Sequence, residues 1–327
     1  MSAGEPEASP QPHFRITEFT DPVVHVTEFT DPACPWAWGS EPVFRRLRHG
    51  LAPRLRWRRA FGILFDEDDD PAPDPDAEAR WYEGFIEGVA VHTRAPYAAR
   101  LHWLTRTSWP ASVVAKAAEA QGAQVADRVL RRLRETTFVL GRPADTLAAA
   151  EEAVRGVPGL DVRQLLDERA LSAARDAVRA DRAEARRPLA EVYGLQGPGP
   201  HPGRAKELTE GHRYALPTLL FEGPGGRICV PGWRPLRDYL DAASTAAGTS
   251  LRLPAPLGPD DASALWRSLT EPELRLLTSG SEPPADAVRV VTANGPLWLH
   301  PDEAKHHPAT KAQAAGVSDN ETPKGVH

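Results

Sequence analysis

The chain has 327 residues, 41% of them hydrophobic and 26% charged, a composition typical of a soluble globular protein with a core. Its net charge of -6 argues against a dedicated nucleic-acid-binding protein, which would need a basic surface. No run approaches the roughly 18 apolar residues that cross a bilayer, and the polar, Pro-rich start resembles no signal segment. We therefore expect a cytoplasmic protein without a membrane or nucleic-acid partner. Its two cysteines exclude a disulfide framework.

A short repeat marks the beginning of the chain. The hexapeptide Thr-Glu-Phe-Thr-Asp-Pro occurs at 17–22 and again at 27–32. Two such copies are too few for a repeat architecture, so we assign 1–22 to an N-terminal extension. Only the second copy runs into a cysteine, and only that copy can support thiol chemistry.

The next segments predict a strand, a helix and a second strand. The apolar, β-branched residues 24–29 predict a buried strand that ends at Asp31-Pro32. An apolar stripe predicts a helix over 38–49, and 55–61 is the second strand candidate. The acidic, Pro-rich stretch 66–76 predicts a loop.

Helical patterns then fill the chain from 77 to 193. Six helices are predicted, over 77–92, 110–121, 124–139, 145–155, 161–168 and 172–193. Good N-cap residues precede or open four of them, namely Ser108, Asp145, Asp161 and Ser172. The Gly/Pro loop 195–202 is no phosphate cradle, because its prolines lack the amide donors that such a loop needs.

Strands return near the end of this part. The segments 218–222 and 227–230 flank Gly223-Pro-Gly-Gly226 and predict a hairpin, and a helix follows over 235–243. The order of elements indicates an α/β fold: a small mixed sheet with an all-α domain inserted in its middle.

A small unit follows the Pro-rich linker 245–259. Residues 261–300 predict two helices and then a hairpin whose turn is Asn294-Gly295. The unit is too acidic to bind DNA as a winged helix, so we expect it to serve in packing, to form a homodimer, or to be a wall over the active site. From about 302 onward the sequence predicts a disordered polar tail.

The candidate for chemistry is Cys34. It follows a buried strand and lies in the first turn of the next helix, where free amides and the helix dipole favour a thiolate. Such placement can lower a thiol pKa from about 8.5 to about 3.5–7.5. Pro35 suits the first helical turn and keeps the thiol on an exposed corner. The alternative is a buried structural cysteine.

These features resemble the DsbA family of thioredoxin-fold proteins over about 23–243. The resemblance rests on Cys34-Pro35-Trp36-Ala37 after a strand, on a helical insertion with Ser108-Trp-Pro-Ala111, and on a late Leu216-Pro217-Thr218 before a strand. It is closest to the cytoplasmic branch, which includes polyketide-pathway disulfide isomerase-like proteins, mycothiol-dependent nitroreductases, kappa-class glutathione transferases and 2-hydroxychromene-2-carboxylate isomerases.

The resemblance implies a thioredoxin-like domain from 23–75 and 205–245 and an inserted helical domain over 76–204, to which the sequence pattern adds a small appendage at 260–300 and a disordered tail at 301–327. It also implies that Pro217 is cis and faces the thiol, which leaves the Leu216 backbone free to pair with a substrate. The catalytic candidates are then Cys34, Pro35 and Pro217.

The sequence differs from the dithiol members at position 37, where Ala37 replaces the resolving cysteine. A single thiol cannot close its own disulfide. Cys34 would instead act in a thiol-disulfide oxidoreductase or isomerase that uses a small thiol, mycothiol or glutathione, as co-substrate. The alternatives are a thiol-conjugate transferase or isomerase of the kappa or hydroxychromene-carboxylate type, and a non-redox binding protein.

Other residues are weaker candidates for the site. Trp36 and Trp38, together with Leu216 and His102, are assigned to the binding of a small-molecule or disulfide substrate. Trp36 is expected to point outward beside the thiol, and His102 to be a proton donor if it lies near. Cys229 is expected to pack in the core, and the sequence offers no metal-ligand motif.

Overall fold

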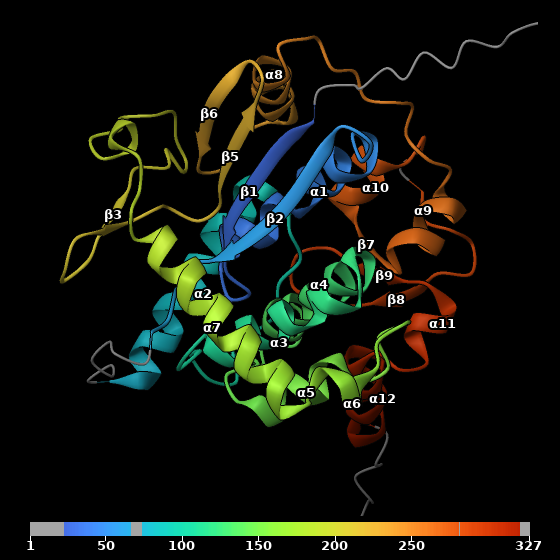
Figure 1. Ribbon diagram of the computed structural model, residues 1–327. Helices are drawn as coiled ribbons and strands as arrows, with labels where there is room; N and C mark the ends of the chain where they lie inside the picture. Colours follow the sequence, from blue (N-terminus) through green and yellow to red (C-terminus); the bar gives the residue numbers. More distant parts are fainter. Residues whose placement is uncertain (1–22, 67–73, 281, 321–327) are drawn as a thin grey trace, which may run out of the picture.

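The computed structural model describes residues 23–66, 74–280 and 282–320 (Figure 1). The predicted extension at 1–22, with the first copy of the repeat, lies outside the described residues, and so does most of the acidic loop. None of the helices in the described ranges is both long and apolar enough to cross a membrane.

A four-stranded mixed sheet has the strand order β2-β1-β5-β6. Its strands are β1 (Val24–Thr30), β2 (Leu55–Phe61), β5 (Thr218–Gly223) and β6 (Gly226–Pro231). β1 and β2 are parallel, and α1 (Pro35–Gly50) is the crossover between them. β5 runs antiparallel to both β1 and β6. The structure confirms the predicted mixed sheet and the β5–β6 hairpin.

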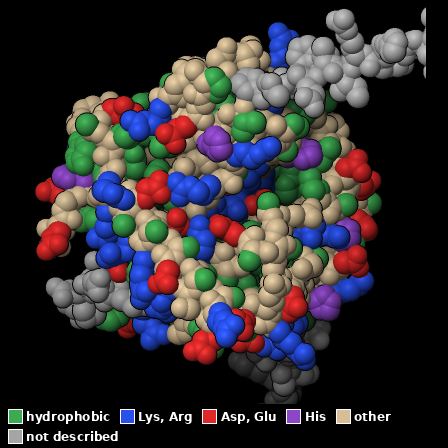
Figure 2. All heavy atoms as spheres, viewed as in Figure 1, with side chains coloured by type: hydrophobic (Ala, Val, Ile, Leu, Met, Phe, Trp, Pro, Cys, Tyr) green, Lys and Arg blue, Asp and Glu red, His purple; other side chains and the backbone are tan. Residues whose placement is uncertain are grey.

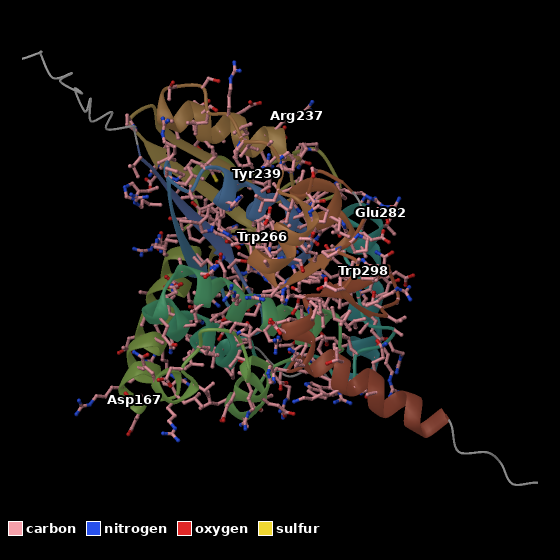
Figure 3. The ribbon with its side chains drawn as sticks, turned by 90° about the vertical axis from the view of Figure 1, so that its right-hand side faces the viewer. Asp167, Arg237, Tyr239, Trp266, Glu282 and Trp298 are labelled. Carbon is pink, nitrogen blue, oxygen red and sulfur yellow. The ribbon has the colours of Figure 1, made fainter. Side chains whose placement is uncertain are left out.

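The two faces of this sheet have separate cores, because successive side chains of a strand point to opposite faces. α1 and α8 (Leu236–Ala247) cover one face, where Val26 and Phe221 pack with Tyr239 of α8 (Figure 3). On the other face, Phe29 and Leu220 pack in the cluster that contains Cys34. The thiol therefore lies on the face that α1 and α8 leave uncovered.

The predicted helical insertion is present between β2 and β5, and most of its helices shift only slightly at their ends. The helices are α2 (Pro75–Thr93), α3 (Trp109–Ala118), α4 (Ala123–Phe138), α5 (Leu147–Val154), α6 (Val162–Leu165) and α7 (Glu168–Ala185). The last predicted helix ends earlier than 193, at Ala185. The insertion has a core of its own, and α7 connects it to the edge strand β2 (Figure 1). Two short strands, β3 (Lys206–Glu207) and β4 (His212–Arg213), form a separate ribbon before β5.

The C-terminal unit is larger than the sequence predicts. It contains α9 (Pro259–Trp266), β7 (Ser268–Thr270), α10 (Glu271–Leu277), β8 (Val288–Val290) and β9 (Leu297–Leu299). The predicted hairpin is β8–β9, and β7 joins its β9 edge. Three residues between two helices are too few to show the period of a strand, which is why the sequence did not reveal β7.

The expectation of a disordered tail does not hold for residues 301–320. They form α11 (Pro301–Ala304) and α12 (Pro308–Asn320). His307 between them is fully buried, and its Nε2 lies 2.9 Å from Glu135 Oε2 of α4. This contact across 172 residues orders a segment whose own composition is polar.

Buried charges connect the C-terminal unit to the rest of the molecule. Glu273 of α10 is fully buried and accepts hydrogen bonds from Arg45 Nη1 of α1 at 2.9 Å and from both terminal nitrogens of Arg131 of α4. A bidentate pair of this kind fixes both distance and orientation. The unit is therefore packed against both the sheet domain and the insertion. Packing is one of the three roles expected for it.

A second part of the same network lies beneath α1. Arg134 of α4 is fully buried and forms ion pairs with Glu41 of α1 and Glu28 of β1. Burial alone would raise the pKa of Glu41, but Arg48, Arg134 and Arg45 outweigh it and hold that pKa well below its usual range. The carboxylate stays charged inside the protein.

Candidate active site

A tightly bonded turn between β1 and α1 places Cys34. Asp31 is fully buried, and its carboxylate accepts hydrogen bonds from Ala33 N, Leu64 N and Ser108 Oγ, each at 2.8 Å. Tyr82 of α2 donates to Ala33 O at 2.8 Å. Ser108 was predicted to cap α3, but it makes no cap hydrogen bond and supports this turn instead. The insertion thereby holds the turn that carries the thiol.

The structure brings together the two motifs on which the site depends. Cys34 is the N-cap residue of α1, with Pro35 in the first turn. Its Sγ donates to Leu216 O at 3.4 Å, across 182 residues of chain. The Leu216–Pro217 peptide is cis, as the resemblance implies. A thiol at a helix N-terminus thus lies beside a cis-proline loop at the start of β5.

The surroundings of the thiol differ from the prediction. Cys34 is only 3% exposed and does not lie on an open corner. Burial raises the pKa of the thiol to about 11, and the nearby charge of Asp31 adds to this effect. Backbone N–H groups of Ala37 and Trp36 act in the opposite direction but are weaker. The helix terminus contributes as expected, but desolvation outweighs it, and the thiol is protonated at neutral pH.

Trp36 points inward, contrary to the expected outward orientation. Its side chain is 8% exposed and stacks on His201 at a centroid distance of 5.0 Å and on His92 at 6.2 Å. The ring of Trp233, just after β6, also lies near Trp36, with 6.2 Å between the two ring centroids. Aromatic rings from four segments therefore gather around Trp36, which shares a buried cluster with the thiol.

His201 is the residue of this site that the sequence did not reveal. Its Nε2 lies 3.0 Å from Leu216 O, and burial lowers its pKa to about 4. The neutral ring can then donate its Nε2–H to that carbonyl. Leu216 O therefore already has two partners, Cys34 and His201, and is not free as expected. A histidine in a Gly/Pro loop carries no sequence signal of such a position.

Two proposed substrate-binding residues lie elsewhere. Trp38 is 3% exposed, stacks on Phe138 and donates its Nε1–H to Pro96 O at 2.8 Å, so it belongs to the core. His102 is exposed and its ring contacts Trp103, while its backbone N–H bonds to Gly141. The described contacts of His102 are all with other residues of the insertion.

Cys229 is free and partly buried on β6, in the cluster that also contains Cys34. Cys229 pairs with Leu220 of β5. Leu220 follows Leu216 by four residues, which span about 13 Å in an extended chain. Burial raises the pKa of its thiol to about 12. Within the described ranges, no three His, Cys, Asp or Glu side chains form a group suited to a metal ion.

The comparisons with known proteins agree with this architecture. A thioredoxin family model matches residues 28–187. Among solved structures, a "putative protein disulfide isomerase" from Nitrosomonas europaea is 16% identical, with a TM-score of 0.51, and the match covers 67% of this chain and 96% of that chain. No curated protein matches the sequence.

Two further solved structures are similar to this chain. The cytosolic disulfide reductase DsbM from Pseudomonas aeruginosa is 19% identical, with a TM-score of 0.47 and coverage of 68% of this chain and 95% of that one. A 2-hydroxychromene-2-carboxylate isomerase is 15% identical, with a TM-score of 0.40 and coverage of 68% and 94%. The chain is a thioredoxin-fold protein with a helical insertion, and the solved structures that it resembles are DsbA-like proteins.

Proposed function

We propose that this protein is a thiol-dependent oxidoreductase or isomerase in which Cys34 is the nucleophile. The observation that carries the proposal is the position of Cys34 Sγ at a helix N-terminus, 3.4 Å from Leu216 O beside cis Pro217. Thiolates attack disulfides from such positions, because the helix terminus stabilises the charge that develops on sulfur.

The reaction has two balanced steps. The Cys34 thiolate attacks one sulfur of a disulfide, a mixed disulfide forms, and the other sulfur leaves as a thiolate. Ala37 is fully buried in the place of a resolving cysteine. An external small thiol, of the glutathione or mycothiol class, then attacks the substrate sulfur of the mixed disulfide, so that the Cys34 thiolate leaves and a disulfide between the substrate and the small thiol forms. A second small thiol reduces that disulfide, so two molecules of this co-substrate are oxidised to their own disulfide for each substrate disulfide reduced to two thiols.

Entry of the substrate requires a rearrangement at Leu216. His201 contacts the same carbonyl oxygen as Cys34 and stacks on Trp36. We propose that a backbone N–H of the substrate replaces the His201 hydrogen bond and displaces the ring. Water or substrate would then reach the sulfur, reverse the desolvation and lower the thiol pKa from about 11.

A second candidate is a thioredoxin-fold protein that binds or isomerises a ligand without a redox cycle, including the thiol-conjugate transferase type. The buried thiol with its raised pKa favours this candidate, as does the ring cluster of Trp36, His201 and Trp233. In such a protein the aromatic cluster would hold an apolar ligand or a thiol conjugate.

The test is reduction of a small mixed disulfide with glutathione or mycothiol as the external thiol. We expect Cys34→Ser to lose at least about 100-fold in rate, with a Cys34 mixed disulfide visible by mass spectrometry in the parent protein. Cys229→Ser is the matched control and should retain the rate. Equal rates in the parent and in Cys34→Ser would contradict the redox proposal and favour the second candidate.

A further inference from the structure

A cavity of about 190 Å³ lies where the three parts of the molecule meet. Its walls include Arg45, Arg48 and His49 of α1, Gln124 and Arg128 of α4, and Trp266 of α9. Trp266 lies between the sheet domain above and the insertion below (Figure 3). Figure 2 shows basic side chains deep in a hollow near the middle of the face that it presents. The volume far exceeds the roughly 10–15 Å³ that one water requires.

The inner wall of the cavity is electrically balanced. Arg45 contacts Glu273 at 2.9 Å, and Arg48 contacts Glu41 at 2.8 Å, so both guanidinium charges have carboxylate partners behind them. Asp127 also lines the cavity, and it pairs with Arg59 and, at 3.7 Å, with Arg48. Its negative charge is therefore paired mainly with Arg59.

The outer wall carries Arg128, which interacts electrostatically with Glu303 and Asp127. Among the described residues, Arg128 forms no ion pair: its terminal nitrogens bond only to the backbone oxygens of Pro158 and Leu265. Its Nε is buried and has no hydrogen-bond partner in the described part of the chain. Arg267 and Arg46 nearby likewise bond to an imidazole and to a backbone oxygen, not to a carboxylate. A surplus of guanidinium groups thus surrounds a space that can admit a ligand.

We propose that this cavity binds a small oxyanion, a phosphate or carboxylate group, held by Arg128 with Gln124. A guanidinium group matches both anions in its fork of N–H donors, and charge-assisted bonds of this kind are the stronger class. His49 and Trp266 meet edge to face at 5.4 Å and give one side of the cavity an aromatic wall. That wall suits an apolar or planar portion attached to the anionic group.

The first measurement is isothermal titration calorimetry of the full chain with sodium phosphate and, separately, with sodium succinate. Sodium chloride at equal ionic strength is the reference. We expect saturable binding of one equivalent of at least one of the two anions, which also tells phosphate from carboxylate. Absence of saturable binding of both anions up to about 10 mM would overturn the proposal.

Variants then place the site. Arg128→Gln should weaken binding by at least about tenfold, while Arg237→Gln, an exposed arginine of α8 on the sheet domain, should bind as the parent does. Because Arg128 also donates hydrogen bonds to two backbone oxygens, circular dichroism checks that the Arg128→Gln variant is folded. Gln124→Ala removes an exposed side chain and should weaken binding even if Arg128→Gln is unstable. Unchanged affinity in Gln124→Ala and in a folded Arg128→Gln would overturn this location. Cys34→Ser should bind normally, which separates this site from the thiol site.

Discussion

Two buried groups of α1, Cys34 at its N-cap and Glu41 near its middle, respond to burial in opposite ways. At its N-terminus, Cys34 is buried among apolar and aromatic groups, and its pKa rises to about 11. About two turns later, Glu41 is equally buried, yet arginines hold its pKa below the usual range. Burial penalises the charged form of both groups. The pKa falls only where nearby opposite charges stabilise the charged form by more than burial destabilises it, as the arginines do for Glu41.

The comparison explains two kinds of stability in one helix. At the N-terminus of α1, a thiol that is reactive when charged is kept neutral in a cluster that includes Trp36. In the middle of the helix, permanent charges join α1 to α4 and to the C-terminal unit through Glu273. The thiol can change its state with access to solvent, whereas the charged groups cannot lose one partner without leaving buried charge.

The largest expected effect is at the buried ion pairs of Glu273. Glu273→Ala leaves Arg45 and Arg131 buried without this partner, and we expect it to lower the free energy of unfolding by about 3–5 kcal/mol. Urea denaturation measures this loss. Glu271→Ala is the control, because Glu271 is in the same helix turn but its side chain is 47% exposed, and its pair with Arg275 is worth little. Similar losses in the two variants would contradict a structural role for the buried pair.

An intermediate effect is expected at the thiol end at high pH. Because the folded-state pKa of Cys34 is raised from about 9 to about 11, the native state holds a proton that the unfolded state has lost. The stability from this thiol is complete below pH 9 and falls as pH rises toward 11, by up to about 1.4 kcal/mol per pH unit. The measurement is urea denaturation across this window for the parent and for Cys34→Ser. Parallel curves for the two proteins would show that the thiol is not buried in solution.

The smallest expected effect concerns the cover over the thiol. His201→Ala removes the bond to Leu216 O and the stacking on Trp36, and we expect the alkylation rate of Cys34 to rise about tenfold, equivalent to about 1.4 kcal/mol. Iodoacetamide labelling at pH 8 in a Cys229→Ser background measures this rate. His102→Ala, which changes a histidine in the loop between α2 and α3, should leave the rate unchanged. If His201→Ala does so too, another segment protects the thiol.

Much of the fold was predictable from local patterns. The apolar, β-branched run 24–29, the Gly-rich turn before 227–230 and the capped helices of the insertion specify elements through neighbouring residues alone. The sequence also indicated which cysteine stands between a strand and a helix, since that depends on a few adjacent positions. The expectation that Cys34 lies near Leu216-Pro217 came from the resemblance, and in the structure Cys34 Sγ lies 3.4 Å from Leu216 O.

The tertiary structure decided what no local pattern contains. Cys34 was expected to be exposed with a lowered pKa, but it is buried, and His201, 167 positions later, contacts the same Leu216 O and stacks on Trp36. The tail was expected to be disordered, but Glu135 of α4 binds His307 and orders it. Burial and ion pairing depend on which distant segments meet, and both set the pKa of a group through its surroundings. The sequence by itself determined the position of the thiol, and only the packed structure determined its protonation state.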